Sequence, residues 1–140
     1  MAAKFKLEVV TLEKKLLEKE VESVILPTSL GETGIMANHI PMVTALEPGE
    51  LKFRVGEEFL FYAVSGGFAE IRPDRVLVLA DAAEHAEEID EQKAEEARKK
   101  AEETMKRKDL PVEEFEEAAA ALRRSIMMLK IAKKRKRRQV

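Results

Sequence analysis

The chain has 140 residues, a formal net charge of −2, two histidines and no cysteine. This length is typical of one domain or two small ones. The lack of cysteine excludes disulfides, thiolate nucleophiles and cysteine-rich zinc sites, and the two histidines lie far apart in the sequence, so we expect no metal site. No apolar run approaches the roughly 18 residues of a membrane span, and the N-terminus lacks a signal-peptide pattern. We expect a soluble, cytosolic chain that docks on a membrane-bound partner at most indirectly.

Composition divides the chain into two parts. All six glycines and four of the five prolines precede residue 84, and helix-forming Ala, Glu, Lys, Arg, Leu and Met dominate after it. The sequence therefore predicts a sheet domain at residues 1–83 and an antiparallel helical hairpin with a basic tail at residues 84–140. A rigid platform joined to a movable arm is the expected organisation.

The first part of the chain alternates between apolar and polar residues. Residues 5–9 predict a half-buried strand. Residues 12–20 are ambiguous, because their propensities favour helix whereas their context favours strand, and we predict strand. Residues 21–26 predict a strand that ends at Pro27, and residues 28–49 are rich in turns around a short apolar piece at 42–46.

Clean alternation then returns after residue 50. The expected strands and turns are strand 51–55, turn 56–57, strand 59–64, turn 65–67, strand 68–72, turn 73–74 and strand 76–80. Many short antiparallel strands at this spacing predict an N-terminal antiparallel β-sandwich or flattened barrel.

The second part predicts two helices. Asp90 is a suitable N-cap for a helix that runs to about Lys108, and Pro111 suits the first turn of the next helix. The apolar stripe of the first helix consists of Ala94, Ala97, Ala101 and Met105, and that of the second of Val112, Phe115, Ala119, Leu122, Ile126 and Leu129. A thin alanine stripe facing a richer one predicts a hairpin that opens at little cost, which is a candidate switch.

Charge is distributed unevenly along these helices. Residues 84–117 include 14 acidic and 7 basic side chains, whereas residues 123–138 include nine basic side chains and no acidic one. A block of like charge indicates a solvated tail, and often a polyanionic partner.

Two sequence strings are the most specific features of the chain. The first is LPTSLGETGIMANHIPMVTALEPG at residues 26–49, and the second is YAVSGGFAEI at 62–71, followed by VLVLADAAE at 76–84. Together they resemble the epsilon subunit of F-type ATP synthases, and the resemblance covers essentially the whole chain. It implies a non-catalytic subunit of the central stalk, peripheral on the cytoplasmic face of the cell inner membrane. Its implied role is to couple gamma to the c ring and to inhibit ATP hydrolysis through mobile C-terminal helices.

The resemblance also implies contacts for the loop around Glu32 and His39, with the c ring and the foot of gamma. Positive φ angles at Gly31 and Gly34 would allow a tight loop that presents Glu32 outward. The alternative is that these glycines only shape the sandwich, and that His39 is a turn histidine bonded to its own loop. The pair Ala37-Asn38 departs from the Pro-Gly or Pro-Asn that commonly precedes this histidine in the family.

Some family members bind ATP in the hairpin, through a motif resembling Ile/Leu-Asp-x-x-Arg-Ala. Here the string is IDEQKA at 89–94, with Lys93 where arginine is expected and Met128 where a further cation is expected. The implied nucleotide-binding residues are Glu84, Asp90, Lys93, Lys100 and Arg124. Lysine lacks the planar fork that clamps phosphate, so the expectation is ATP as a weak regulatory ligand. The alternative is an ordinary N-cap with solvated helix charges.

In the family that the chain resembles, the second helix can extend toward the alpha and beta subunits and meet an acidic loop of beta. The basic residues at 123–138 suit this role. The implied inhibitory contacts are Arg123, Lys130, Lys133 and Lys134. Attraction of this kind weakens as salt increases.

Two other functions are disfavoured by the sequence. Nucleic-acid binding by the tail is disfavoured because the tail has no aromatic side chain to stack on bases and the rest of the chain is acidic. An enzyme is disfavoured because the sequence shows no nucleophile with a base, no phosphate-binding loop and no metal-ligand spacing.

Overall fold

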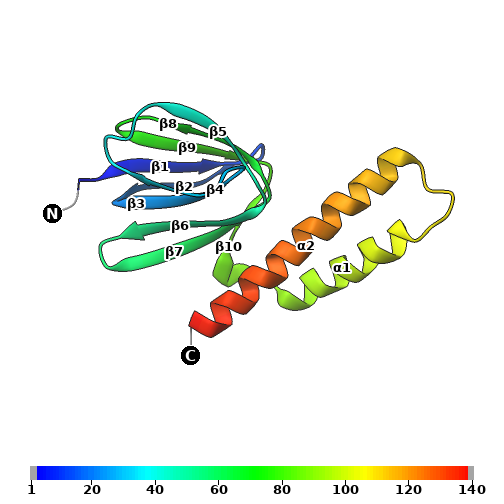
Figure 1. Ribbon diagram of the computed structural model, residues 1–140. Helices are drawn as coiled ribbons and strands as arrows, with labels where there is room; N and C mark the ends of the chain where they lie inside the picture. Colours follow the sequence, from blue (N-terminus) through cyan, green and yellow to red (C-terminus); the bar gives the residue numbers. More distant parts are fainter. Residues whose placement is uncertain (1–2, 139–140) are drawn as a thin grey trace. The chain divides into compact units, whose positions relative to one another are not determined.

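The computed structural model describes residues 3–138 of the chain. It divides into two units, the first ending at His85 and the second beginning at Ala86 (Figure 1). The composition of the sequence predicted this boundary after Ala83. The sheet continues two residues further, because Ala83–His85 pairs with the strand at residues 58–64.

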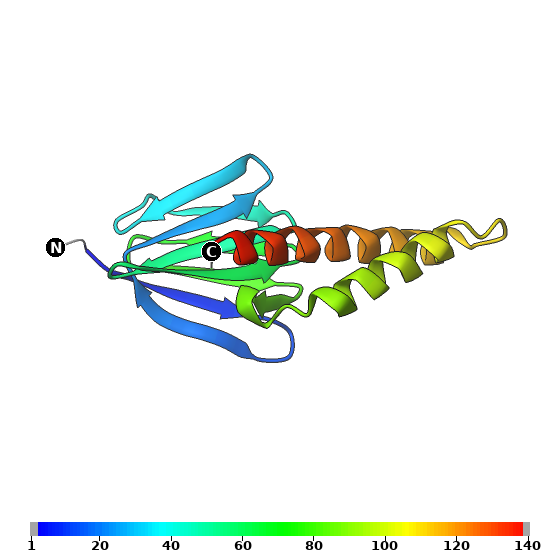
Figure 2. The ribbon, with the colours of Figure 1, turned by 90° about the horizontal axis from the view of Figure 1, so that it is seen from below.

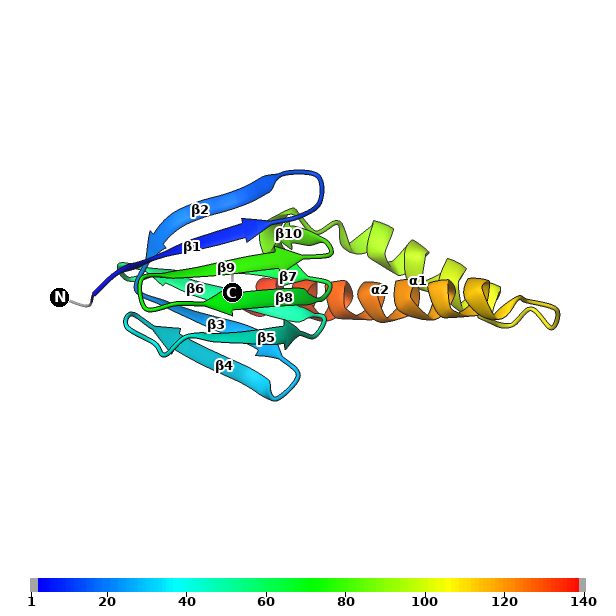
Figure 3. The same ribbon diagram turned by 90° about the horizontal axis from the view of Figure 1, so that it is seen from above.

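The first unit is an all-β domain. Its strands are β1 (Phe5–Val10), β2 (Lys15–Val21), β3 (Ser23–Thr28), β4 (Gly31–Met36), β5 (Met42–Leu46), β6 (Gly49–Val55), β7 (Glu58–Val64), β8 (Gly67–Ile71), β9 (Arg75–Ala80) and β10 (Ala83–His85). They hydrogen-bond in the order β10-β7-β6-β3-β5-β8-β9-β1-β2, and β4 pairs with β3 outside this path. Figure 3 shows the hairpins β1–β2 and β3–β4 toward opposite edges of this unit. The predicted β-sandwich is confirmed.

Residues 15–21 form a strand despite their helical propensity. β2 pairs with β1 in antiparallel register. The ion pairs Lys6–Glu18 and Lys15–Glu8 connect the two strands, and Lys15 also pairs with Glu18 within β2. Beside Lys15, the pKa of Glu18 lies below its ordinary value. Charged side chains are common on edge strands, since they discourage pairing with other chains. Tertiary pairing has therefore overridden local propensity.

The core of this unit is formed by the inward residues of the alternating strands. Its buried members are Phe5, Leu7, Val9, Val21, Val24, Leu26, Ile35, Leu46, Leu51, Phe53, Val64, Ala69, Ile71, Val76, Val78 and Ala80. Thr28 is buried where β3 leaves β6 and pairs with β5. Its hydroxyl group donates to the carbonyl oxygen of Gly31 at 2.8 Å, so this polar group is satisfied.

Two glycines let neighbouring strands approach closely at one corner. Gly66 and Gly67 have φ angles of 114° and 132°, in the left-handed region that favours glycine. A Cβ atom on Gly67 would lie 2.0 Å from the carbonyl oxygen of Leu79. A glycine at position 67 is therefore what allows this close approach of the strands.

The second unit consists of a short 3-10 helix, η1 (Ala86–Glu88), and the helices α1 (Glu91–Met105) and α2 (Val112–Arg138). Asp90 is the N-cap of α1, since its side chain accepts a hydrogen bond from the backbone nitrogen of Lys93. α1 ends three residues before the predicted Lys108. Figure 2 shows α1 and α2 as an antiparallel pair, as predicted.

The predicted apolar seam of α2 is wrong at several positions. Val112, Phe115 and Ile126 are exposed, whereas the buried positions of this helix are Ala118, Ser125, Met127, Ile131 and Ala132. On α1, Ala101 is buried and Ala97 is exposed. Spacing of apolar residues marks a stripe but not which of two adjacent faces turns inward.

Candidate functional site

A row of apolar side chains crosses the outer face of the sandwich. Val10 on β1 pairs with Leu79 on β9, Leu79 pairs with Phe68 on β8, and Phe68 pairs with Ala45 on β5. Leu79 is 51% exposed and Phe68 is 59% exposed. Because contiguous exposed apolar residues mark interaction surfaces, we call these four residues the outer apolar row.

The structure places Glu32 and His39 at opposite ends of β4. Glu32 is the second residue of this strand and pairs with Pro27, so it does not lie on a loop as expected. Gly31 has a φ angle of 105°, but Gly34 has no positive φ. The Glu32 side chain is exposed beside the turn between β3 and β4.

His39 lies in the connection between β4 and β5. Its Nδ1 atom lies 2.7 Å from the carbonyl oxygen of Ile40, so Nδ1 donates this hydrogen bond. A hydrogen bond within its own loop is what the alternative interpretation of His39 expects, and it leaves the proposed contact with other subunits untested. Its Nε2 atom is available as an acceptor when the ring is neutral.

The predicted nucleotide-binding residues are spread over both units. Glu84 lies on β10 in the first unit, while Lys93, Lys100 and Arg124 are exposed on the helices of the second. The carboxylate of Asp90 accepts from the Lys93 backbone nitrogen at 3.1 Å, which is the geometry of an ordinary N-cap.

A groove of about 510 Å³ lies between α1 and α2. It is lined by Ala97, Lys100, Ala101, Thr104, Glu114, Glu117, Ala118 and Ala121. Lys100 therefore faces a space shared by both helices. Glu114 and Glu117 line the same space, and their negative charges oppose an anionic ligand.

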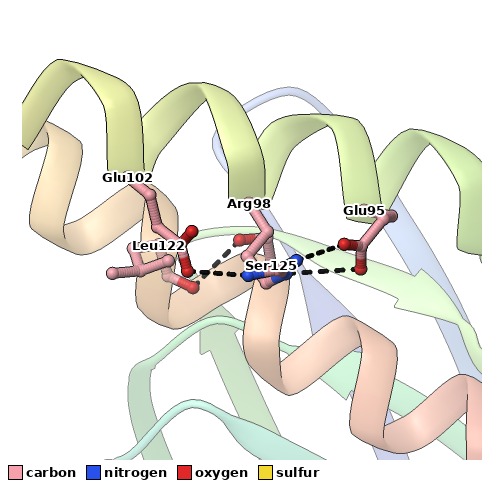
Figure 4. A network of polar contacts seen from close by, with 5 residues as sticks. All are labelled: Glu95, Arg98, Glu102, Leu122 and Ser125. Carbon is pink, nitrogen blue, oxygen red and sulfur yellow. Dashed lines mark hydrogen bonds and ion pairs between the residues drawn. The ribbon is translucent and has the colours of Figure 1, made fainter.

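Arg98 binds two acidic side chains on the same face of α1. It forms ion pairs with Glu95 and Glu102, and the contact between its Nη1 atom and Glu102 is 2.7 Å. Figure 4 shows this network opposite Ser125 of α2, whose hydroxyl group donates to the Leu122 carbonyl. Hydrogen bonding to Arg98 holds the pKa of Glu95 below its ordinary value. The network covers a seam in which Ala101 and Ser125 are buried.

The predicted inhibitory residues lie along α2. Arg123, Lys130 and Lys133 are exposed and Lys134 is half-buried. Lys133 lines a second groove, of about 630 Å³, together with Glu91, Gln92, Glu95, Glu96, Lys99 and Leu129. The basic residues of α2 therefore lie partly against the acidic residues of α1.

Two basic residues that sequence reasoning did not single out make specific contacts. Arg135 donates to the carbonyl oxygens of Ala86, Glu87 and Ile89, and Lys136 forms an ion pair with Glu91 at 2.6 Å. In the sequence both are members of one block of like charge, and nothing there distinguishes them from their neighbours.

Neither a metal cluster nor a membrane-spanning helix is found in residues 3–138. No group of three or more His, Asp or Glu side chains is placed to hold a metal ion in this part of the chain. The helices described here are not long and apolar enough to cross a membrane.

Comparison with known families tests the resemblance seen in the sequence. Residues 4–86 match the model of the ATP synthase Delta/Epsilon chain, beta-sandwich domain, and residues 87–133 match that of the ATP synthase Delta/Epsilon chain, long alpha-helix domain. The ATP synthase epsilon chain of Dehalococcoides mccartyi is 49% identical over 135 residues, covering 96% of both chains. The chain belongs to the epsilon-chain family of ATP synthases. A further epsilon chain, from Herpetosiphon aurantiacus, is 45% identical over 95% of this chain and 97% of its own length.

Solved structures agree with the epsilon-chain fold. A chain of the Euglena gracilis mitochondrial ATP synthase matches with a TM-score of 0.70 and 24% identity, covering 100% of this chain and 84% of that one. A chain from the central stalk and c ring of the Tetrahymena thermophila enzyme matches with a TM-score of 0.58 and 14% identity, covering 94% and 98%. At these identities the likeness concerns the fold.

Within the epsilon-chain family, the contacts of Arg135 and Lys136 fall outside the matched part of the helical domain. That match ends at residue 133. The outer apolar row, by contrast, lies entirely inside the matched sandwich domain. A signal for the row existed in the sequence, since Phe68 and Leu79 are large apolar residues that alternate with the inward residues Ala69, Val78 and Ala80.

Proposed function

We propose that this epsilon-family chain is a non-catalytic rotor subunit that couples gamma to the c ring and restrains ATP hydrolysis through α1 and α2. The observation that supports the proposal best is the difference between the two units. The first has a continuous core beneath an exposed apolar row. The second has a seam of small residues and a basic helix end.

The outer apolar row is the proposed docking face for gamma. Its central members, Phe68 and Leu79, lie on adjacent strands of a well-packed sheet, so the surface is preorganised. A rigid apolar face loses little conformational entropy on binding, which suits a permanent contact in a rotor.

Glu32 and His39 are the proposed polar contacts with the c ring and the foot of gamma. Because they lie at opposite ends of β4, they would serve two separate contacts rather than one. Glu32 is an exposed carboxylate beside a tight turn, and His39 offers an Nε2 acceptor. Such contacts place the subunit peripherally on the cytoplasmic face of the cell inner membrane.

Inhibition is assigned to α2. In the extended form, Arg123, Lys130, Lys133 and Lys134 would meet an acidic loop of the beta subunit. Most buried residues of α1 and α2 are alanine or serine, with Met127 and Ile131 as the larger apolar members, and burial of small side chains contributes little free energy. Release of α2 is therefore inexpensive compared with unfolding the sandwich.

The proposal includes ATP as a weak regulatory ligand. Its binding would favour the folded hairpin by population shift. Lys100 faces the groove between the helices, but Glu114 and Glu117 line it as well. Titration of the chain with ATP, compared with Lys100→Gln, tests this part. Equal affinities for the two chains would remove Lys100 from the proposal.

The deciding experiment measures ATP hydrolysis by a reconstituted alpha-beta-gamma complex. The full chain is compared with a truncation that ends at His85, since this end point preserves the pairing of β10 with β7. We expect the full chain to suppress turnover and the truncation to leave it high. Binding of both forms to gamma is the control.

Equal turnover, with both forms bound to gamma, would contradict the inhibitory role and leave only a coupling platform. Failure of both forms to bind gamma would contradict the rotor assignment itself.

A further inference from the structure

The start of the helical unit is bound by one side chain from near its end. The Nη1 atom of Arg135 lies 2.9 Å from the carbonyl oxygen of Ala86, 3.0 Å from that of Glu87 and 3.2 Å from that of Ile89. These carbonyls lie in and just after η1, and carbonyls at a helix end have partial negative charge. A guanidinium group is a strong donor there, because its hydrogen bonds are charge-assisted.

A second contact reinforces the first. Nζ of Lys136 lies 2.6 Å from a carboxylate oxygen of Glu91, in the first turn of α1. Hydrogen bonding to Lys136 holds the pKa of Glu91 below its ordinary value. Two consecutive residues of α2 thus hold η1 and the first turn of α1.

Buried residues flank the Arg135 contacts, whereas the Lys136–Glu91 ion pair is partly exposed, with 62% and 32% of the two side chains accessible. Ala86 and Ile89 are 1% and 4% exposed, and Ile131 and Ala132 are 3% and 0% exposed. Exclusion of water strengthens a charge-assisted hydrogen bond, and makes loss of the donor more costly. The other buried residues of α1 and α2 are Ala101, Ala118, Ser125 and Met127, and of these only Met127 has a large apolar side chain.

We propose that Arg135 and Lys136 form a latch that holds the last turns of α2 against η1 and α1, and so sets how often α2 is released. The latch is a property of the isolated chain. Its effect on hydrolysis rests on the function proposed above, in which the released α2 is the inhibitory form. Both latch residues lie beyond the matched family region, which ends at residue 133.

Hydrogen exchange of the full chain tests the latch itself. Arg135→Met removes the guanidinium group and keeps an aliphatic stem, and Arg137→Met is a matched control at an exposed position two residues further along α2. We expect Arg135→Met to exchange about tenfold faster in residues 86–96 and 128–136, as loss of a charge-assisted hydrogen bond implies. Unchanged exchange in the sandwich shows that the variant is folded.

Equal exchange in Arg135→Met and Arg137→Met would overturn the latch. No assembly with other subunits is needed for this result, so it is independent of the proposed function.

ATP hydrolysis by the alpha-beta-gamma complex tests the effect on inhibition. Glu91→Gln weakens the latch and leaves every basic residue of α2 in place, while Glu96→Gln makes the same charge change at an exposed position of α1. We expect Glu91→Gln to inhibit about twofold more strongly than the wild type, which is the scale of a partly exposed ion pair. Glu96→Gln should inhibit like the wild type.

Equal inhibition by the two glutamine variants would overturn the regulatory effect of the latch. The truncation that ends at His85 distinguishes two cases. If hydrolysis is the same with the truncation as with the full chain, the proposed inhibitory function is contradicted as well. If the truncation abolishes inhibition, the proposed function stands and only the regulatory effect is lost.

Discussion

At the scale of single residues, the corner between β8 and β9 is the least tolerant position of the sandwich. Gly67 has a φ angle of 132° and lies directly against the backbone of Leu79. Neither the dihedral angle nor the space can accommodate a side chain. Gly34 differs on both counts, since its φ is not positive and a Cβ atom added there would meet open space within 4 Å.

We predict that Gly67→Ala lowers the free energy of unfolding by about 3 kcal/mol or more, because a Cβ atom there clashes with rigid backbone. Gly34→Ala should change it by no more than about 0.5 kcal/mol. Urea denaturation of the full chain measures both. A small effect at Gly67 would mean that the β8–β9 corner can relax.

At the scale of elements, ion pairs as well as apolar contacts join the parts of the helical unit. The pKa values of Glu91 and Glu95 are both lowered, the first chiefly by Lys136 and the second chiefly by Arg98. A lowered pKa in the folded state means that the ionised group stabilises it. That contribution is complete above the ordinary glutamate pKa, and it is lost as the pH falls through the lowered value.

We predict that the hairpin melts at a lower temperature at pH 3 than at pH 7, with the loss beginning below about pH 5. Circular dichroism at a helical wavelength measures the midpoint. The double variant Glu91→Gln/Glu95→Gln should show a smaller shift between the two pH values. An identical shift in the variant would assign the pH dependence to other groups.

At the scale of the whole molecule, the two units offer different kinds of surface to partners. The sandwich presents an apolar face on rigid strands, whereas α2 presents exposed cations on a helix. Apolar contacts are insensitive to salt, and attraction between exposed charges is screened within about 8 Å at physiological ionic strength. Docking and inhibition should therefore respond differently to the same change in conditions.

We predict that Phe68→Glu weakens binding to gamma by about 10- to 100-fold, as expected for a central apolar contact. Phe59→Glu is the matched control, because Phe59 is 48% exposed on β7 and lies outside the outer apolar row. Titration calorimetry with gamma measures both affinities. Equal losses in the two variants would show that the row is not the docking face.

We also predict that raising the salt concentration weakens inhibition by the full chain while gamma binding changes little. The double variant Lys130→Gln/Lys133→Gln should inhibit less and show a weaker salt dependence, because two exposed cations are removed. ATP hydrolysis over a salt series measures this. The same salt dependence in the variant would place the inhibitory charges elsewhere.

The sequence by itself determined the order and type of most elements, but it missed β4 (Gly31–Met36), in the part expected to be rich in turns, and the short β10 (Ala83–His85). Alternation of apolar residues predicted the strands, and Asp90 and Pro111 marked the helix starts, because these signals are local. Family membership was also readable from residues 26–49 and 62–84. The charge block predicted a basic helix end, but not which of its members would find partners.

Tertiary structure alone decided the rest. β2 became a strand because β1 was available to pair with it, and α2 turned Ser125 rather than Ile126 inward because packing selects among neighbouring faces. Arg135 reaches carbonyls 46 to 49 residues away, and Phe68 joins Leu79 and Ala45 in one row only through strand register. Contacts between residues distant in sequence depend on the assembled fold, and no local pattern encodes them.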